Sequence, residues 1–383
     1  MNPRILAVPV AAAVIAACLW FFLGTESYVS VGTLITVSAE PDGAANVETG
    51  GKTAASENSA AAAGKNPAVD WKRFNALLNM DASGGGKISE PTSEDIARFL
   101  AKRGETPANL ITIYEKSRDA RWLACALELF PNSPIVLMAA VESIPSPAAV
   151  PAGWTAEPDA KRMAYIERFK AADPNNPLAW IYAAQEFFHA QHTAEGVAEI
   201  RASLDRPAFY TYSNERMDSA QRLYEDMGLH PVEASVLALV SQTIPHTTAA
   251  MQSSRSLTEW QKAATDSGDT AAADDAIQLT YHLGRTFATP EASRTLLGQL
   301  VGVSMEARAL KALPPGTQPG WLAVWPEIRL AEMESQKQNV KELTAGLEWI
   351  LQSQDEPLLV EYLRRNRADG ELSALTWLKA RKK

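Results

Sequence analysis

Residues 173–189 read DPNNPLAWIYAAQEFFH, and this stretch indicates the class of the fold. Pro174 and Pro177 end one segment and start the next, and apolar side chains then recur every three or four residues. That spacing places them on one face of an α-helix, because a helix turns once every ~3.6 residues. Ala183 and Ala184 are small enough for a second helix to approach closely. The stretch therefore predicts one helix of a packed helix pair.

The same turn pattern occurs earlier in the chain, where FPNSP at residues 130–134 separates two apolar segments. The two Asn-x-Pro turns, at positions 132 and 175, lie 43 residues apart. A repeat of ~34 residues is typical of stacked helix pairs. We assign the excess to the proline-rich insert at residues 144–151, which cannot be helical throughout. A third helix pair is predicted on either side of the Ser-Gly-Asp turn at residues 267–269, over 257–266 and 271–283.

On these residues the chain resembles tetratricopeptide (TPR)-like helical repeats. The shared features are alanines where helices pair, an aromatic residue in the first helix, and Asp-Pro-Asn-x-Pro or Gly-Asp turns. The order of landmarks is also similar to an uncharacterised family of exported, membrane-anchored bacterial helical proteins: IARFL at residues 96–100, the Phe-Pro-Asn-x-Pro turn, and LVG at 300–302. The resemblance covers residues 109–287. It implies an irregular α-solenoid, a right-handed stack of helix pairs, and it assigns no activity.

Helical spacing continues through the rest of the body, and the breaks fall at Pro, Gly and Asn clusters. The predicted fold class is therefore all-α, with helices over residues 93–104, 109–116, 119–130, 178–189, 195–204, 296–313, 325–351, 355–367 and 371–380. The helix over 296–313 carries Gly298-x-x-x-Gly302, which allows another helix to approach closely. Glu306 and Arg308 make this helix too charged to span a membrane. We expect the last four helices to cap the final repeat.

Composition divides the chain into four parts. Small and polar residues make up almost all of residues 39–68, so this stretch cannot bury enough apolar surface to offset the entropy of ordering. We predict an N-terminal membrane anchor or signal segment (1–24), a flexible linker (25–69), a TPR-like repeat domain (70–289) and a C-terminal helical subdomain (290–383).

The leader contains 19 consecutive residues without a charge, residues 5–23. A helix of that length is ~28 Å long, which matches the hydrocarbon thickness of a bilayer. The sequence therefore predicts one N-terminal transmembrane helix that is retained as an anchor. Two alternatives stay open: residues 15–18 (IAAC) match the box before a lipidated cysteine at Cys18, and an ordinary signal peptidase would remove the leader.

The charges beside the leader predict its orientation. Arg4 precedes the apolar segment, whereas Glu26, Glu40 and Asp42 follow it, and the first later base is Lys52. Positive charge stays on the cytoplasmic side of a membrane helix. All three interpretations of the leader therefore place the body on the periplasmic or extracytoplasmic side.

The composition also argues against several classes of function. The 383 residues carry a formal net charge of -9, so no nucleic acid is expected as a partner. Of the two cysteines, Cys18 lies in the leader, which leaves the body one thiol and no internal disulfide. The sequence has neither a phosphate-binding Gly-Lys-Ser/Thr nor a Gly-x-Ser-x-Gly elbow, so we predict no cofactor and no catalytic residue.

Two stretches of the sequence partly match metal-binding patterns, and each has a simpler interpretation. Residues 81–89 (DASGGGKIS) copy the first half of a calcium loop, but position 12 is Thr92 instead of a bidentate Glu. We predict a glycine turn there. Glu186, His189 and His192 are spaced to share a helix face, yet histidines are common at helix ends, so we predict no metal site.

The remaining candidates are apolar. Phe187 and Phe188, with Tyr210 and Tyr212, are predicted to line a partner-binding groove, the alternative being core packing between stacked helices. Cys125 lies within an apolar helix, which predicts a buried and unreactive thiol.

These features predict a membrane-tethered, non-catalytic scaffold that presents a protein-binding surface outside the cytoplasm. The partner is a protein that the sequence does not identify. The alternative is a cell-envelope enzyme acting on glycan or peptide with carboxylates from separate helices. Two carboxylates converging in a deep cleft would favour the enzyme, and a shallow groove without them would favour the scaffold.

Overall fold

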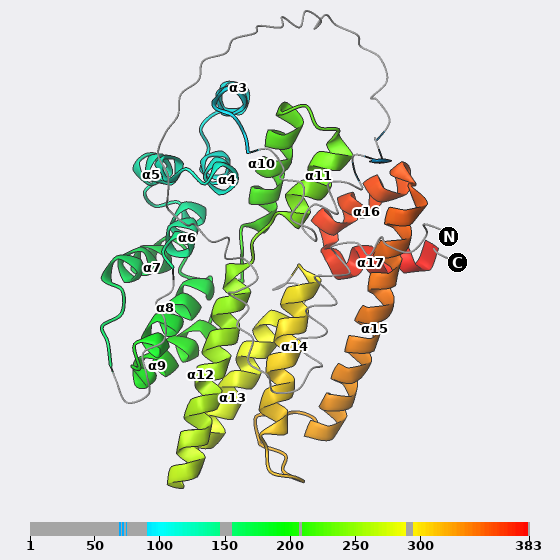
Figure 1. Cartoon of the computed structure of the whole chain (residues 1–383). Coiled ribbons are helices and arrows are strands. Elements are labelled where there is room, and N and C mark those ends of the chain that lie inside the picture. Colours follow the sequence, from blue (N-terminus) through cyan, green and yellow to red (C-terminus); the bar gives the residue numbers. More distant parts are fainter. Residues whose placement is uncertain are drawn as a thin grey trace, which may run out of the picture.

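The computed structural model describes residues 69, 71–72, 74, 90–145, 155–206, 209–288 and 294–381 (Figure 1). Every regular element within these residues is a helix, which confirms the predicted all-α class. The helices are α3 (Ser93–Arg103), α4 (Pro107–Ser117), α5 (Ala120–Leu129), α6 (Pro134–Ser143), α7 (Ala160–Ala172), α8 (Leu178–His189), α9 (Thr193–Leu204), α10 (Ser213–Asp226), α11 (Pro231–Val240), α12 (Pro245–Ser267), α13 (Thr270–Ala288), α14 (Leu296–Lys311), α15 (Pro326–Ser353), α16 (Glu356–Asp369) and α17 (Glu371–Arg381).

The helix ends follow local capping chemistry. Before α3, the Thr92 hydroxyl accepts from the Asp95 backbone N–H at 3.2 Å, and the Asp95 carboxylate accepts from the Thr92 N–H at 3.1 Å. Gly104 ends α3 with φ of 79°, a conformation that costs glycine little. α8 spans the residues predicted for it, and Asp119 caps α5 where that helix was expected to begin.

Sequence analysis missed two helices and part of a third, and it implied α6 and α7 only as segments beside the Asn-x-Pro turns, without bounds. α10 and α11 were not predicted, and α12 begins at Pro245, twelve residues before the expected start at 257. α10 is rich in polar side chains, so its apolar spacing is weak. A signal for α11 was present, because His230 and Glu233 form a capping box around Pro231 at its first position.

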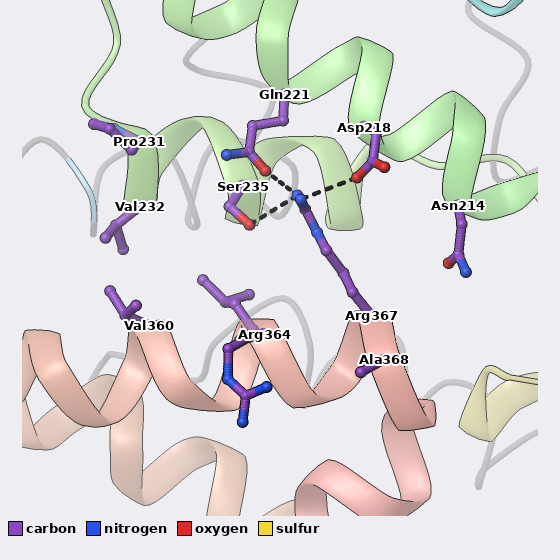
Figure 2. A pocket seen from close by; sticks show the side chains of 11 residues that line it. Asn214, Asp218, Gln221, Pro231, Val232, Ser235, Val360, Arg364, Arg367 and Ala368 are labelled. Carbon is purple, nitrogen blue, oxygen red and sulfur yellow. Dashed lines mark hydrogen bonds and ion pairs between the residues drawn. The ribbon is translucent and has the colours of Figure 1, made fainter.

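Consecutive helices pack in pairs: α4 with α5, α6 with α7, α8 with α9, α10 with α11, α12 with α13, and α16 with α17. The pairs do not contact one another in simple chain order. α10 packs against α3 and α4, while α12 packs against α8. α11 lies opposite α16, the next-to-last helix of the chain (Figures 1 and 2). The α10–α11 pair therefore lies between the first helices and the last ones.

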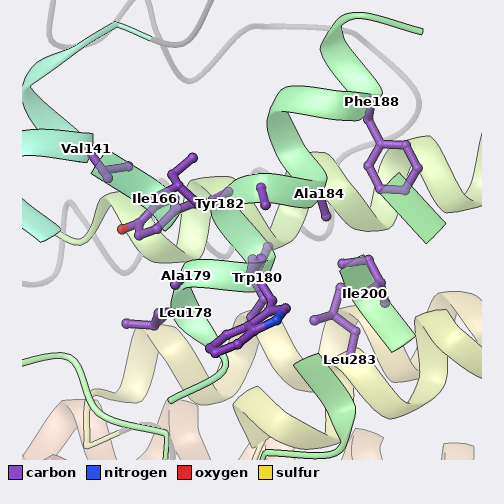
Figure 3. Packing of buried hydrophobic residues seen from close by; sticks show 14 of the residues in the cluster. Val141, Ile166, Leu178, Ala179, Trp180, Tyr182, Ala184, Phe188, Ile200 and Leu283 are labelled. Atoms are coloured by element: carbon purple, nitrogen blue, oxygen red, sulfur yellow. The ribbon is translucent and has the colours of Figure 1, made fainter. Parts of the chain in front are cut away.

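α8, the helix of the opening stretch, runs through the largest core cluster (Figure 3). Ala183 is fully buried and Trp180 is 8% exposed. The guanidinium carbon of Arg206 lies 3.6 Å from the centroid of the Trp180 ring and covers its outer face. Side chains from α6, α7, α9, α12, α13 and α14 surround the helix. The stretch that predicted the fold class is therefore also at the centre of its packing.

α13 and α14 cross at two glycines. A Cβ atom at Gly302 would lie 2.6 Å from the Gly284 carbonyl oxygen, and a Cβ at Gly284 would lie 2.8 Å from the Gly302 carbonyl oxygen. Real Cβ atoms do not approach backbone this closely. The close approach expected at Gly302 is confirmed, with Gly284 as its counterpart on α13.

The predicted leader helix lies outside the described residues. Among those that are described, none of the helices combines the length and the apolar character needed to cross a bilayer. The predicted C-terminal subdomain would contain α14 to α17, and α14 packs closely against α13 of the predicted repeat domain.

The α13–α14 crossing predicts the effect of adding a single methyl group. Gly302→Ala should reduce the free energy of unfolding by ~3 kcal/mol or more, because the two backbones must separate to admit the Cβ. Gly320→Ala is the matched control, since nothing lies within 4 Å of its added Cβ, and it should change stability by less than ~0.5 kcal/mol. Chemical unfolding of the two variants measures the difference. Equal stabilities would contradict the crossing.

Candidate functional site

A hollow of about 460 Å³ lies between the α10–α11 pair and α16 (Figure 2). Its lining combines apolar and charged side chains: Asn214, Asp218, Gln221, Pro231, Val232, Ser235, Val360, Leu363, Arg364, Arg367 and Ala368. α10 and α11 form one wall and α16 forms the other (Figure 2). Two of these three helices are the ones that sequence analysis missed.

Arg367 spans the hollow from α16 to the opposite wall. Its Nη1 donates to Asp218 Oδ1 at 3.0 Å, and its Nη2 donates to Ser235 Oγ at 3.2 Å and to Gln221 Oε1 (Figure 2). Charge-assisted hydrogen bonds of this kind are stronger than neutral ones. Arg367 therefore joins the C-terminal helices to the α10–α11 pair and fixes the spacing of the walls.

The open side of the hollow carries Val360 and Arg364, one helical turn apart on α16. Val360 is 46% exposed and the Arg364 side chain is 61% exposed. Arg364 Nε and Nη2 each donate to Glu361 at 2.7 Å, and these bonds hold the pKa of Glu361 at about 2. Val232 on α11 and Leu363 on α16 are both buried on the facing walls, and we name this pair the apolar floor of the hollow. An apolar floor beside an exposed guanidinium suits an amphipathic peptide that carries a carboxylate.

A second hollow of about 490 Å³ is lined by α17, by the end of α16 and by residues at the start of α14. Arg294, Asp369 and Trp377 contribute to its lining. The guanidinium carbons of Arg365 and Arg381 lie 4.8 and 4.5 Å from the centroid of the Trp377 ring. Among the residues that line each hollow there is one carboxylate, so neither lining offers the acid pair of a glycosidase.

The four aromatic residues predicted to line a groove lie at opposite ends of α8. Asn176 Nδ2, just before the helix, donates to the Tyr210 carbonyl at 2.7 Å, and the Tyr210 and Tyr212 ring centroids are 4.8 Å apart. Phe187 and Phe188 lie in the last turn, ~16 Å further along the axis. Phe188 is 5% exposed and Tyr210 is 45% exposed. The structure does not bring the two pairs together.

The structure places Glu186, His189 and His192, the helical residues with metal-site spacing, in other surroundings. Arg162 Nη1 donates to Glu186 Oε1 at 2.5 Å, with both side chains nearly fully buried. His192 is the N-cap of α9, and burial lowers the pKa of His189. No cluster of three or more metal-ligating side chains occurs within the part of the chain that the structure describes.

Cys125 is half-buried in α5, less enclosed than expected. Burial raises the pKa of its thiol, and the carboxylates of Glu105 and Glu128 raise it further. A raised pKa disfavours the reactive thiolate. The glycine-rich stretch at 81–89 lies outside the described residues.

A network of charged and polar side chains surrounds Arg216 of α10, which is 5% exposed. Its Nη1 donates to Glu142 Oε2 at 3.3 Å and its Nη2 to Glu115 Oε1. The Tyr182 hydroxyl donates to Glu142 Oε1 at 2.8 Å, and burial raises the pKa of Glu142. We name these four residues the Arg216 network. It joins α4, α6, α8 and α10, and sequence reasoning missed it because Arg216 stands in a polar helix.

Lys116 lies beside this network, at the end of α4. Its Nζ donates to Ser241 Oγ at 2.8 Å and to the Ser241 carbonyl at 3.0 Å. Burial lowers the pKa of Lys116 to about 8, although Glu115 acts in the opposite direction. α4 is thus bonded to the end of α11 as well as to α10.

Comparison with known proteins found no matching family model, curated protein or solved structure. The resemblance to TPR-like repeats therefore stays a prediction that rests on residue patterns.

Removal of the Arg216 guanidinium should strongly destabilise the fold. Arg216→Met leaves the partly buried Glu115 and Glu142 without their cation, which should cost ~3–5 kcal/mol of unfolding free energy. The matched control is Arg364→Met, which removes a solvent-exposed pair and should leave the stability nearly unchanged. Chemical unfolding compares the two. Adding Glu142→Gln to Arg216→Met should recover part of the loss, and equal effects of the two single variants would contradict the network.

The lowered pKa of Lys116 predicts that the stability of the fold depends on pH. Because its pKa is about 8 in the folded chain and near 10.5 when unfolded, the unfolded state binds more protons between these values. Stability of the wild type relative to Lys116→Met should therefore rise with pH across this window, by up to ~1 kcal/mol per pH unit. Urea unfolding of both proteins from pH 7.5 to 9.5 provides the test. Parallel profiles would contradict the lowered pKa.

Proposed function

We propose that this protein is a membrane-tethered, non-catalytic scaffold that binds a protein partner outside the cytoplasm. The partner is held in the hollow between the α10–α11 pair and α16. The observation that carries the proposal is the rim of this hollow, where Val360 is 46% exposed beside the exposed Arg364. An exposed aliphatic side chain next to an oriented guanidinium, above an apolar floor, is typical of a peptide-binding surface.

The architecture supports this proposal as an irregular TPR-like solenoid. Helices pack in consecutive pairs, and alanines lie fully buried where they meet, as at Ala183 and Ala184. The α10–α11 pair folds back onto α3 and α4 and so leaves the line of the stack. α15, α16 and α17 then cover the end, as a cap must. This departure from a regular stack is what sets the hollow against α16.

In this proposal, the leader and the linker hold the binding surface close to a membrane. The 19 uncharged residues at 5–23 match a bilayer-spanning helix, and the charges around them favour an exported body. A tethered binding surface gains from the anchor, because both partners are confined to the same thin layer.

The charges define the kind of partner. The chain as a whole carries a formal net charge of -9, whereas the rim of the hollow presents Arg364. Because Arg364 Nε and Nη2 already donate to Glu361, an acidic group on the partner would meet this guanidinium through Nη1. Such a contact fixes orientation more than affinity. The partner segment we propose is an amphipathic helix with apolar side chains toward Val232 and Leu363 and a carboxylate toward Arg364.

The contacts favour the scaffold over the envelope enzyme. Glu115 and Glu142 do converge, but both bond to Arg216 inside the fold instead of facing a cleft. In the hollow, the carboxylate of Asp218 is likewise bonded to Arg367. Because these carboxylates are bonded to guanidinium groups of the fold itself, they are poorly placed to transfer a proton to a substrate.

Site-specific photo-crosslinking in cells tests the proposed surface. A benzophenone amino acid at Val360 should give one discrete adduct with a protein partner, and Arg364→Glu should reduce its yield several-fold because the guanidinium no longer pairs with the partner's carboxylate. Leu129 is the matched control, an aliphatic residue of α5 with 47% exposure that lies away from the hollow. The same adducts from both positions, or an adduct that is insensitive to Arg364→Glu, would contradict the proposal.

A further inference from the structure

The loop between α14 and α15 carries exposed apolar residues at the end of the molecule where the lower ends of α12, α13 and α14 lie (Figure 1). Residues 312–326 read ALPPGTQPGWLAVWP and contain no charge. Val324 is 38% exposed, Trp325 is 47% exposed and Ile328, in the first turn of α15, is 52% exposed. We name these three side chains the apolar tip.

The loop holds the apolar tip in place. Leu313 and Leu322 are buried in a cluster with side chains of α13, α14 and α15, and the Trp321 ring centroid lies 5.2 Å from that of Tyr281. The Leu322 N–H donates to the Pro319 carbonyl at 3.0 Å and closes a turn. The exposed side chains therefore project from an ordered backbone, so docking them costs little conformational entropy.

We propose that the apolar tip rests in the interfacial layer of the lipid bilayer that holds the leader, an inference that depends on the proposed membrane tether. Tryptophan favours this layer, because its ring is apolar and its N–H can still reach water. The uncharged loop avoids the cost of bringing ionised groups toward the hydrocarbon, and exposed Glu327, between Trp325 and Ile328, limits the contact to the headgroup level. Exposed Asp266 and Asp269 lie in the α12–α13 turn at the same end, so the contact suits a zwitterionic surface better than an anionic one.

The dimensions allow the tip and the anchor to share one bilayer. α15 has 28 residues, which places the tip ~42 Å from the α15–α16 turn. Beyond that turn, the Val69 N–H donates to Glu356 at 3.4 Å, which fixes the start of the body there. A flexible chain as long as the predicted linker, residues 25–69, spans on average ~37 Å. The body can therefore lie along the membrane, and the tether raises the local concentration of a contact that would be weak alone.

Contact quenching of tryptophan fluorescence tests the proposal on the full-length chain. The protein is reconstituted into phosphatidylcholine vesicles with and without acyl-chain bromine near the headgroups. Trp20 in the leader reports the anchor and Trp325 reports the tip. In the Trp20→Phe variant, bromolipid quenching should persist, and in Trp20→Phe/Trp325→Phe it should be lost. Trp20→Phe/Trp377→Phe is the control and should keep the quenching of Trp20→Phe.

A charge at the tip gives a second measurement. In the Trp20→Phe background, Ile328→Asp should abolish the quenching, whereas Leu129→Asp, at a similarly exposed aliphatic residue of α5, should leave it unchanged. Quenching through Trp20 without quenching through Trp325 overturns the tip contact and leaves the anchor standing. Quenching through neither tryptophan overturns both. Quenching that survives Ile328→Asp also overturns the tip contact, because lipid would then reach the tryptophans without an apolar side chain at position 328.

Discussion

The buried guanidinium of Arg216 requires anionic partners close to it, and this requirement determines how α4, α6, α8 and α10 pack in the described fold. Arg216 is held by Glu115 of α4 and Glu142 of α6, and Tyr182 of α8 completes the site. Because leaving one of these charges unpaired in the interior is costly, the folded state must pack the four helices that carry these residues against one another. α10 is thereby drawn toward α4, although the pairs nearest to it in sequence lie elsewhere.

The surface hollow follows from this placement. Once α10 packs on α3 and α4, α11 faces the C-terminal helices, and Arg367 of α16 bonds across to Asp218 and Ser235. Two arginines thus set the geometry of the hollow. Arg216 holds α10 against α4 and α6 in the interior, and Arg367 sets the distance between α10 and α16. The hollow exists because these walls are bonded at one point, while Val360 and Arg364 remain at its open side.

The two proposed contact surfaces differ in chemistry and lie far apart. The hollow combines an apolar floor with guanidinium groups and suits a protein segment. The apolar tip has no charge along residues 312–326 and suits a lipid surface. The tip lies at the start of α15, which is ~42 Å long, and the hollow is lined by α16, which follows the other end. A body lying on a bilayer through its tip would therefore keep the hollow accessible to a partner.

The sequence by itself determined the all-α class, most helix boundaries and the close approach at Gly302, because helical spacing, capping and small residues act over a few positions. It did not determine that Phe187 and Tyr210 lie at opposite ends of α8, nor that Arg216 is buried. Arg216 and Glu115 are 101 residues apart, and no local pattern distinguishes a polar residue on the surface from one that meets a distant carboxylate. Only the packing of α4, α6, α8 and α10 decides that contact, because the free energy of a buried charge depends on partners that the tertiary structure supplies.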